Sequence, residues 1–354
     1  MKPPASIRLE AATVCQLKCP LCPTAGGEVG KSLGSGLLSP ERFARFLADH
    51  PYLEEIELSN WGEIFLNRKL PELMRIAREA GVAVHASNGA NLNHLSEEAV
   101  EAIVRYRLRT LTCSIDGTSQ ETYGRYRRGG NLQTVLQNVD RINAMKRRFR
   151  TPLPRLTWQF VIFEHNAHEL EIAREMARVR NMKFYAKSNW DDFYERSEPS
   201  LGEAGQKVQA ALGYRDRKEL AERTGQHALR GVCRQLWLTP QVNFDGRMLG
   251  CCVNYWKDFG NVFEDGLTSV FQGEKLEYAR EMLQGRKAAR EDIACSSCSV
   301  YQHIRENESW LKPSEVEISE PNWKRWLKRR IHPDLLGYFQ ILREWWSDRK
   351  RRAQ

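Results

Sequence analysis

Short apolar segments alternate with longer segments of helical periodicity over about the first 190 residues. Segments rich in β-branched and aromatic residues predict strands at 5–13, 53–60, 82–89, 110–116, 155–163 and 182–189. Apolar residues at three- and four-residue intervals predict helices at 39–50, 69–81, 96–107, 131–148 and 168–181. Such alternation predicts an α/β fold with a parallel sheet and helices outside it. Six units with right-handed crossovers can curl into a partial (β/α)6, TIM-like barrel.

The loops after the first four predicted strands are rich in polar residues. They carry a group of three cysteines, then "NWGE", "SNG" and "SIDG". The carboxyl ends of parallel strands meet at one edge of a barrel, and active sites lie there. We therefore expect these four loops to face a common site.

Charge and cysteine content narrow the class of protein. The chain has 354 residues and a net charge of +9, and much of the basic excess lies in the last stretch. A basic balance favours anionic partners without choosing between phosphorylated substrates, nucleic acid and a membrane surface. No apolar run is long enough to span a membrane and no signal sequence precedes the first strand, so a cytoplasmic protein is expected. Nine cysteines in such a protein, grouped at ligand spacing, indicate metal or cluster chemistry rather than disulfides.

The first group is "CQLKCPLC", with Cys15, Cys19 and Cys22. Thiolates bind zinc and iron–sulfur clusters, but a structural zinc site needs a fourth ligand, and the next histidine, His50, falls at the end of a helix. The Cys-x3-Cys-x2-Cys spacing after strand one resembles that of the radical S-adenosylmethionine (SAM) enzymes. The resemblance implies a [4Fe–4S] cluster held by the three cysteines, with the fourth iron open for SAM. It also implies reductive cleavage of SAM to a 5′-deoxyadenosyl radical that abstracts a hydrogen atom from the substrate.

The resemblance extends over the other loops. Trp61-Gly62-Glu63 is similar to the family's Gly-Gly-Glu segment, although Ile64 stands where a proline is usual. It implies that Gly62 lets the backbone approach SAM and that Glu63 accepts from the ammonium group of SAM. "HASNGANL", "CSIDGTSQETYGRYRRGG" and "QFVIFEHNAHELE" match the family in the same order. The SAM contacts implied are Leu21, Gly62, Glu63, Asn88, Ser114, Asp116 and an arginine such as Arg128.

The second cysteine group has five members after residue 230. "VNFDGRML" predicts a β-hairpin that brings the cysteines on either side of it together, and a helix over 268–283 leads to a Cys-x2-Cys knuckle. This resembles the auxiliary-cluster domain of SPASM or shortened twitch type, in which full domains carry more cysteines. The resemblance implies one auxiliary [4Fe–4S] cluster, with a zinc ribbon on the same thiolates as the alternative. The four ligands expected are Cys233, Cys251, Cys295 and Cys298.

Two cysteines remain outside these sets. Cys252 has two interpretations: a hydrogen-atom donor for an epimerase, or a packed thiol beside the cluster ligand. Cys113 lies within a predicted strand and is expected in the core.

The predicted domain organisation has four parts. A barrel at 1–195 is followed by a linker with short helices at 196–230, an auxiliary-cluster domain at 231–305 and a basic, Trp-rich helical tail at 306–354. The tail packs back on the barrel, or it lies on an anionic membrane surface or a partner. No known binding motif supports nucleic acid as its target.

The function expected first is oxidation of a hydroxyl-bearing small molecule, such as a sugar, aminocyclitol or nucleotide-linked sugar, with a flavodoxin- or ferredoxin-like electron donor. The expected substrates include anionic or phosphorylated compounds, because basic residues of the barrel could contact an anionic group. These residues are Arg125, Arg127, Arg128, Arg155 and Lys187. Candidates for a general base at strands five and six are Gln159, Glu164, Tyr185 and Lys187.

Three alternatives remain. One is redox-neutral epimerisation through Cys252. Another is modification of a ribosomal peptide, which usually comes with a leader-binding domain, whereas this chain starts its barrel within ten residues. The non-enzyme alternative is a zinc-bearing, nucleic-acid-binding protein.

Overall fold

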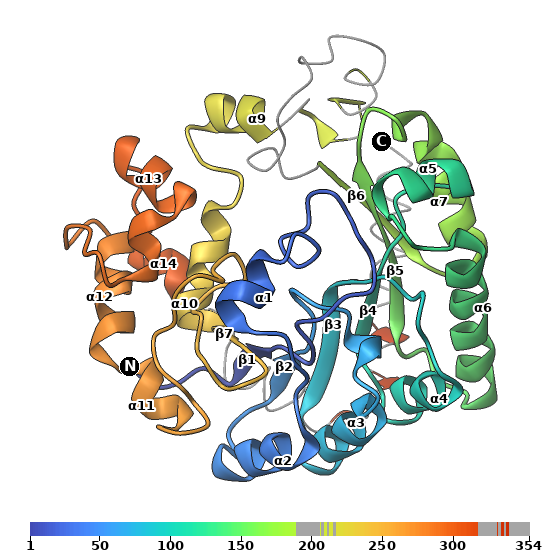
Figure 1. The fold of residues 1–354 in the computed structure, drawn as a ribbon, viewed down its shortest axis with the longest axis horizontal. Helices are drawn as coiled ribbons and strands as arrows, with labels where there is room; N and C mark the ends of the chain where they lie inside the picture. Colours follow the sequence, from blue (N-terminus) through green and yellow to red (C-terminus); the bar gives the residue numbers. More distant parts are fainter. Residues whose placement is uncertain are drawn as a thin grey trace.

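The computed structural model of the chain describes residues 1–188, 206, 209–210, 212–214, 217–317, 331, 334–335 and 338–339. Seven strands form one curved sheet in the order β6-β5-β4-β3-β2-β1-β7, and neighbouring strands run parallel. β6 and β7 lie at opposite edges, so the described barrel is unclosed (Figure 1). The strands are β1 (Ser6–Leu9), β2 (Glu55–Glu57), β3 (Ala83–Ala90), β4 (Thr110–Ser114), β5 (Arg155–Ile162), β6 (Lys183–Ser188) and β7 (Gln241–Val242).

Helices cover the outer side of the sheet, as the alternation predicts (Figure 1). They are α2 (Pro40–Asp49), α3 (Leu70–Glu79), α4 (Glu97–Arg105), α6 (Leu132–Arg148) and α7 (Leu170–Val179). The predicted cap of α2 is present, because the amide of Arg42 donates to Ser39 Oγ at 3.2 Å. Apolar side chains on the inner faces of these helices, such as Phe43 and Val139, are fully buried against the sheet.

β5 shows which face of the sheet lines the barrel. Trp158 and Phe160 are 0% exposed, and Phe160 contacts Phe184, which lies under Arg174 of α7. Gln159 and Val161 point the other way and line the central cavity. Alternation along the strand therefore separates a structural face from a functional face.

The structure differs from the sequence prediction in three elements. Two short helices were not predicted: α1 (Glu28–Leu33) after the first cysteine group, and α5 (Gln120–Tyr126) after β4. The single helix expected over 268–283 is two helices, α11 (Leu267–Phe271) and α12 (Glu274–Leu283), which are separated at Gly273. The predicted hairpin is present: the amide of Leu249 donates to the carbonyl of Gln241 at 2.7 Å, and the amide of Asn243 donates to the carbonyl of Arg247 at 2.8 Å. Its first strand, β7, also pairs with β1 of the barrel.

The C-terminal region packs beside β1 and β7 (Figure 1). Its helices, besides α11 and α12, are α9 (Arg217–Thr224), η4 (Arg230–Arg234), α10 (Gln235–Leu238), η5 (Ala294–Ser297), α13 (Ser299–Glu306) and α14 (Pro313–Val316). Further short turns are η1 (Ile64–Leu66) and η2 (Ala167–Glu169). One cluster of buried residues continues from the barrel into this region, so the two share a core. The division at residues 195, 230 and 305 stays a prediction.

The described part of the basic tail contacts the barrel. Asp334 accepts from Thr151 Oγ1 at 2.5 Å and pairs with Arg107 Nε at 2.9 Å. This supports the expectation that the tail packs back on the barrel. The four tryptophans on which a membrane or partner interaction would depend lie outside the described residues; they are Trp323, Trp326, Trp345 and Trp346.

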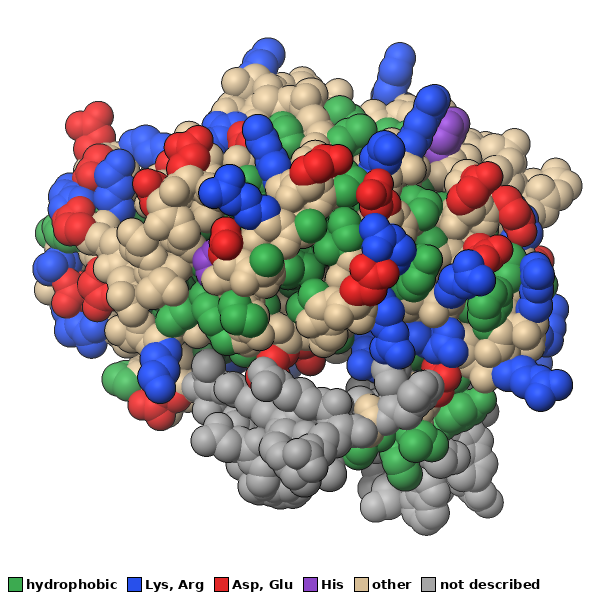
Figure 2. Space-filling model, turned by 90° about the horizontal axis from the view of Figure 1, so that it is seen from below, with side chains coloured by type: hydrophobic (Ala, Val, Ile, Leu, Met, Phe, Trp, Pro, Cys, Tyr) green, Lys and Arg blue, Asp and Glu red, His purple; other side chains and the backbone are tan. Residues whose placement is uncertain are grey.

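The outer surface carries both signs of charge. Figure 2 views the molecule from below and shows Lys and Arg side chains interspersed with Asp and Glu. Exposed pairs on the outer helices include Arg45–Asp49 at 3.8 Å and Arg75–Glu79 at 2.6 Å. The net charge of +9 therefore forms no single-sign patch over the described part of this face.

Candidate active site

The first three cysteines lie together in the loop after β1. Cys15, Cys19 and Cys22 line one cavity, and the amide of Cys22 donates to the carbonyl of Cys19 at 3.2 Å. Burial raises the pKa of Cys15 to about 12, and the nearby charges of Glu63, Cys19 and Cys22 raise it further. Burial also raises the pKa of Cys19, although Arg127 opposes this. Thiolates held this closely need a compensating positive charge, which a metal cluster provides.

The cavity has a volume of about 420 Å³, within the range of small-molecule sites. Its described wall draws on the carboxyl ends of β1 to β6 and on the C-terminal region. Predicted SAM contacts in this wall are Leu21, Glu63, Asn88 and Ser114. Other polar side chains in the wall are Asn60, Asn91, Arg127, Gln159, Lys187, Arg217 and Gln235. The strand-end loops therefore meet at one site, as the sequence predicts.

Glu63 is held rigidly at the edge of this cavity. Its carboxylate accepts from the amide of Asn91 at 2.5 Å and from the amide of Phe65 at 3.2 Å. Burial raises the pKa of Glu63 to about 7, and these hydrogen bonds oppose the rise. The side chain is 2% exposed and lines the cavity, so it is positioned to accept from a bound ammonium group.

Gly62 lets two segments of the protein approach each other closely. It does not belong to the described wall, and a Cβ at this position would lie 2.1 Å from the carbonyl oxygen of Ala12. The glycine therefore lets two protein segments approach each other, the loop after β2 and the loop after β1. Close approach to Ala12 requires a glycine here, and a contact between Gly62 and SAM stays a prediction.

Glu10 was not predicted as a site residue, although it organises the turn before Glu63. Its carboxylate is 1% exposed and accepts from the amides of Asn60 at 3.3 Å, Trp61 at 3.0 Å and Gly62 at 3.2 Å. Burial raises the pKa of Glu10 to about 8, against the effect of these hydrogen bonds. The available signal was a carboxylate directly between the buried-strand residue Leu9 and the apolar Ala11, since such groups are rarely buried without partners.

Arg127, rather than Arg128, reaches the cavity. Its Nε donates to Asp116 Oδ2 at 2.6 Å and its Nη1 lies 3.8 Å from Cys19 Sγ. Asp116 is 0% exposed and also accepts from the amide of Val161 at 2.7 Å, so it positions Arg127 from behind the wall. Arg128 is exposed, and its carbonyl accepts from the amide of Lys18 at 2.9 Å. Helix α5 ends one residue before Arg127, and the buried carboxylate selects which of the two adjacent arginines turns inward.

The four predicted auxiliary cysteines also converge. A second cavity is lined by Cys233, Cys251, Cys295 and Cys298, with apolar neighbours such as Leu283. Burial raises the pKa of Cys233 well above its ordinary value, and the other three thiols add to the rise. Within the described ranges, no three His, Cys, Asp or Glu side chains could hold a single metal ion. The four thiols line one cavity, an arrangement that suits a cluster of several metal atoms.

Cys252 faces away from these ligands. Its thiol belongs to the wall of the first cavity and lies 3.5 Å from Gln235 Nε2, and its amide donates to Gln235 Oε1 at 2.7 Å. Its carbonyl accepts from Asn60 Nδ2 at 3.2 Å. The adjacent Cys251 lines the second cavity, so two consecutive cysteines serve two different sites. Cys113, in contrast, is 0% exposed in β4, where a core residue was expected.

The candidates for a general base separate by exposure. Gln159 and Lys187 line the first cavity, whereas Glu164 and Tyr185 are exposed outside it. Burial lowers the pKa of Lys187 to about 8; the charge of Asp116 opposes this shift, and the charges of Arg127 and Arg217 add to it. Of the other expected cations, Arg155 lies at the amino end of β5, whereas the cavity lies at the carboxyl ends of the strands.

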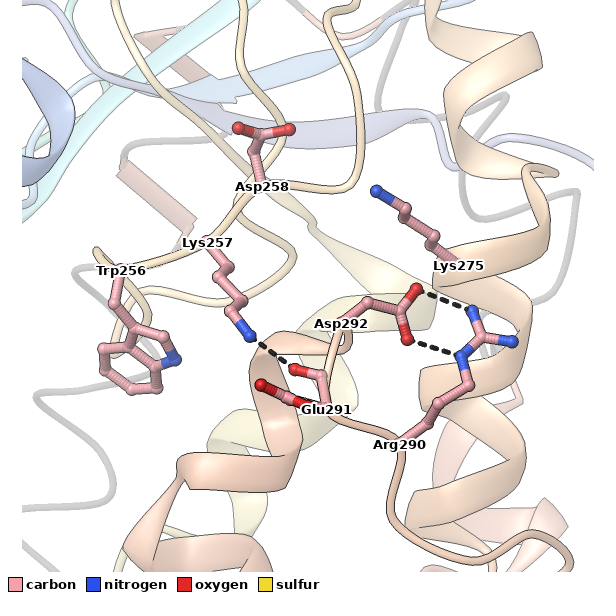
Figure 3. A pocket seen from close by; sticks show the side chains of 7 residues that line it. All are labelled: Trp256, Lys257, Asp258, Lys275, Arg290, Glu291 and Asp292. Carbon is pink, nitrogen blue, oxygen red and sulfur yellow. Dashed lines mark hydrogen bonds and ion pairs between the residues drawn. The ribbon is translucent and has the colours of Figure 1, made fainter.

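A third hollow lies on the outer side of the C-terminal region. It has a volume of about 640 Å³ and is lined by Trp256, Lys257, Asp258, Lys275, Arg290, Glu291 and Asp292 (Figure 3). Lys257 Nζ donates to the carbonyl of Glu291, and Arg290 forms two bonds to Asp292, at 2.6 and 3.0 Å. Trp256 belongs to both this hollow and the wall of the auxiliary cysteine cavity. Basic and acidic groups largely compensate each other here, so we assign no ligand to it.

Comparison with protein families decides the identity of the chain. Residues 9–159 match the model of the radical SAM superfamily, and residues 233–299 match that of the iron–sulfur cluster-binding SPASM domain. The chain is a radical SAM enzyme with a SPASM domain. The first match covers the cavity from Cys15 to Gln159, and the second covers all four auxiliary cysteines. No curated protein matches the sequence.

Solved structures of low sequence identity share the fold. Streptococcus suis SuiB bound to SAM matches with a TM-score of 0.59 and 13% identity, over 90% of this chain and 78% of that chain. SuiB bound to precursor peptide SuiA matches with a TM-score of 0.59 and 12% identity, over 85% and 71%. The enzyme anSMEcpe with bound AdoMet and Cp18Cys peptide matches with a TM-score of 0.53 and 14% identity, over 90% and 92%. At these identities, the likeness establishes the unclosed barrel and its auxiliary region.

The residues present fit the cofactors of this family, which are SAM, a [4Fe–4S] cluster and auxiliary iron–sulfur ligation. Three thiols and then four thiols supply the donor atoms that iron–sulfur clusters use. The indole Nε1 of Trp61, in the wall of the first cavity, is buried without a hydrogen-bond partner among the described residues. A bound molecule would satisfy this donor. Such an enzyme also needs a reductant. The described residues include no helix that is long and apolar enough to cross a membrane.

Proposed function

We propose that the enzyme dehydrogenates a hydroxyl-bearing small molecule, such as a sugar, an aminocyclitol or a nucleotide-linked sugar, in the first cavity. The observation that carries this proposal is the position of Cys251 and Cys252. Cys252 lines the first cavity and Cys251 lines the auxiliary cysteine cavity, so one peptide bond joins the walls of the two cavities. A substrate in the first cavity therefore lies beside a route for an electron to leave it.

The reaction balances as a two-electron oxidation. The carbon that bears the hydroxyl loses a hydrogen atom, the resulting radical loses one electron, and the hydroxyl loses one proton to solvent, which leaves a carbonyl. When bound, SAM and its cluster supply the radical that takes the hydrogen atom, and the auxiliary cluster supplies an acceptor for the electron. The cavity wall excludes water from the carbon radical through Leu17, Val161 and Phe163.

Polar side chains on the strand ends suit hydroxyl groups. Gln159 Nε2 donates to Ser114 Oγ at 3.3 Å, and Asn88 Nδ2 donates to Asn60 Oδ1 at 2.7 Å. Each of these side chains keeps further donor or acceptor capacity that can face the cavity. Uncharged amide and hydroxyl side chains of this kind can orient the uncharged hydroxyl groups of a substrate through hydrogen bonds.

Cys252 favours a second candidate, redox-neutral epimerisation. Its thiol lies in the wall of the same cavity, where it can return a hydrogen atom to a substrate radical. In that case no electron leaves the substrate, and the auxiliary cluster stays in one oxidation state. Peptide modification rests on the likeness to SuiB and anSMEcpe, which were solved with peptides, and this chain shares the fold with them.

The test follows atoms through the reaction. Candidate sugars, aminocyclitols and nucleotide-linked sugars, deuterated at the carbinol carbon, are incubated without oxygen with the reconstituted enzyme, SAM and reduced flavodoxin. Dehydrogenation places deuterium in 5′-deoxyadenosine and yields a carbonyl product. Epimerisation in D₂O with unlabelled substrate instead yields a product of the same oxidation state that has gained one deuterium. Label transfer from a peptide but from none of these small molecules would contradict both candidates.

We further propose that the enzyme works in the cytoplasm with a flavodoxin- or ferredoxin-like donor. Nine cysteines without disulfide bonds support a reducing compartment. Replacing reduced flavodoxin with dithionite is expected to keep SAM cleavage but to change its rate. If only dithionite supports cleavage, the proposed class of donor is wrong.

A further inference from the structure

The oxidation proposed above removes a proton from the substrate hydroxyl, and a proton acceptor in the cavity wall would assist this step. The titratable side chains of the described wall are Cys15, Cys19, Cys22, Glu63, Tyr126, Arg127, Lys187, Arg217 and Cys252. The first three are the cluster thiols, and Glu63 already accepts from two backbone amides. Arginine keeps its proton at neutral pH, and burial raises the pKa of Tyr126, so that its phenol stays protonated. Lys187 and Cys252 remain as acceptors for this proton.

Lys187 lies near the carboxyl end of β6, where the strand ends of the barrel meet. In the parallel register of β5 and β6 it stands opposite Val161, which also lines the cavity. The amide of Val161 donates to Asp116 Oδ1 at 2.7 Å, so a buried carboxylate fixes the neighbouring strand end. Ser188, the next residue of β6, accepts from Arg217 Nε at 3.2 Å. The strand segment that carries Lys187 is therefore held in place at the cavity wall.

The groups that act on the charge of Lys187 come from several elements. Burial lowers the pKa of Lys187 to about 8. Asp116 in the loop after β4 and Cys252 of the C-terminal region oppose this shift, whereas Arg127 after α5 and Arg217 of α9 add to it. Near neutral pH, part of the enzyme therefore carries Lys187 as a neutral amine, and a neutral amine can take a proton.

We propose that Lys187 is the general base of the oxidation and takes the hydroxyl proton of the substrate radical. This inference rests on the proposed function, because it concerns the proton of that reaction. A carbon radical that bears a hydroxyl group is much more acidic than the parent alcohol, and its anion gives up an electron more readily. The O–H bond breaks, an N–H bond forms on Lys187, and the radical anion loses one electron to become the carbonyl. Lys187 then releases the proton to solvent.

Cys252 can react with the same substrate radical in a different way. Its thiol lies in the wall of the same cavity, 3.5 Å from Gln235 Nε2, where it can return a hydrogen atom. Hydrogen return restores the oxidation state of the substrate, whereas loss of the hydroxyl proton to Lys187 promotes its oxidation. If Lys187 is the base, it therefore favours dehydrogenation over epimerisation.

The experiment follows two products of the reconstituted enzyme without oxygen, in the presence of SAM and reduced flavodoxin. The probes are sugars, aminocyclitols and nucleotide-linked sugars deuterated at the carbinol carbon. Deuterated 5′-deoxyadenosine reports hydrogen abstraction, and the carbonyl product reports the later loss of the proton and the electron. Lys187→Met should still form deuterated 5′-deoxyadenosine but should form the carbonyl about 100-fold more slowly, an effect typical of a lost general base. Lys183→Met, which changes an exposed lysine at the start of the same strand, is the matched control and should form both products.

Two further variants separate proton transfer from positive charge and from folding. Lys187→Arg keeps the charge, but its guanidinium cannot act as a base, so it should lose carbonyl formation as Lys187→Met does. Methylamine should restore carbonyl formation to Lys187→Ala in proportion to its concentration, and guanidinium ion should not. Carbonyl formation by the wild type should rise with pH up to about 8, and Lys187→Met should lose this dependence.

Three results would overturn the inference alone: undiminished carbonyl formation in Lys187→Met, undiminished carbonyl formation in Lys187→Arg, or loss of the pH dependence in Cys252→Ala but not in Lys187→Met. Cluster absorbance and SAM binding show whether each variant is intact, and the amine rescue of Lys187→Ala decides the question if the methionine variant is not. A wild-type enzyme that forms neither deuterated 5′-deoxyadenosine nor a carbonyl from any of the probes contradicts the proposed function, and the role of Lys187 as its base falls with it.

Discussion

The two cysteine-lined cavities of this enzyme differ in what surrounds their thiols. The first has the three cysteines of the loop after β1, with Cys252 elsewhere in its wall, among amides, cations and a buried carboxylate. The second has four cysteines, and most of its other wall is apolar, with Leu236, Phe259 and Leu283. One site therefore has too few thiolates to saturate its cluster and many groups for a small molecule. The other has a full set of thiolates and little with which to bind a substrate.

This difference indicates how one chain can separate a site for a reactant from a site for an auxiliary cluster. An incomplete thiolate set leaves a coordination position for a reactant, whereas a complete set protects the cluster from ligands. The boundary between the two sites falls between Cys251 and Cys252. The predictions below alter one side of this boundary and ask whether the other side is unaffected.

The largest effect is expected from Arg127→Met. The change leaves Asp116 buried without its ion pair, which typically costs about 3–5 kcal/mol, and removes the guanidinium that faces Cys19. Formation of 5′-deoxyadenosine, measured by mass spectrometry, should fall by at least about 100-fold, because the cavity loses the positive charge beside Cys19; such a loss corresponds to about 2.7 kcal/mol in the activation barrier. The adjacent, exposed Arg128→Met is the matched control and should keep most of the activity. Equal losses in the two variants would show that the inward position of Arg127 is unimportant.

The next effect concerns two neighbouring cysteines. Cys251→Ser should remove the auxiliary cluster and lower the iron content by about half, because four of the roughly eight irons of two [4Fe–4S] clusters depend on it. Cys252→Ser should keep the full iron content, since its thiol faces the other cavity. Iron and sulfide analysis after anaerobic reconstitution measures both. A loss of iron in Cys252→Ser would place this thiol among the cluster ligands.

A smaller effect, on stability alone, is expected from Gly62→Ala. The added methyl group would lie 2.1 Å from the carbonyl oxygen of Ala12, so the backbone must shift. Overpacking of this kind costs about 1–3 kcal/mol, which thermal unfolding of the reconstituted enzyme should detect. Gly231→Ala is the control, because a Cβ there has no atom within 4 Å. Equal stability of both variants would contradict the close contact between the two loops.

The effect that is smallest per pH unit concerns the slope of the free energy of unfolding with pH. The pKa of Glu10 rises to about 8 in the folded enzyme, so the folded state holds a proton that the unfolded chain releases at lower pH. Stability therefore falls as the pH rises from about 4.5 to 8, and Glu10→Gln should reduce this slope by up to about 1.4 kcal/mol per pH unit. Glu63, with a pKa of about 7 for the same reason, would account for part of the remaining slope. Urea unfolding across this pH range gives the slopes, and identical slopes would show that Glu10 is ionised throughout.

Much of the barrel and of its thiol sites could be predicted from the sequence. Strand and helix periodicity are local, and the Cys-x3-Cys-x2-Cys spacing is local as well, so both are visible without a structure. The side on which a residue faces was harder to predict. Whether Arg127 or Arg128 turns inward depends on Asp116, which lies eleven positions away from Arg127 and is buried behind the wall.

Contacts between distant segments escaped prediction for the same reason. β7 pairs with β1 across more than 230 residues, and Cys252 meets Asn60 through a hydrogen bond over a separation of 192 residues. Glu10 directly follows β1, and its amide partners come from the loop after β2. Periodicity within one element carries no information on these partners.

The most direct test of the central claim is electron paramagnetic resonance of the reduced enzyme with and without SAM. It compares the wild type with a variant in which Cys15, Cys19 and Cys22 are all alanine. The account predicts two cluster signals in the wild type, one of which changes when SAM is added. The variant should keep the other signal, and SAM should leave it unchanged. A variant signal that responds to SAM, or a second site that contains zinc instead of iron, would contradict the division between an open reactive cluster and a closed auxiliary one.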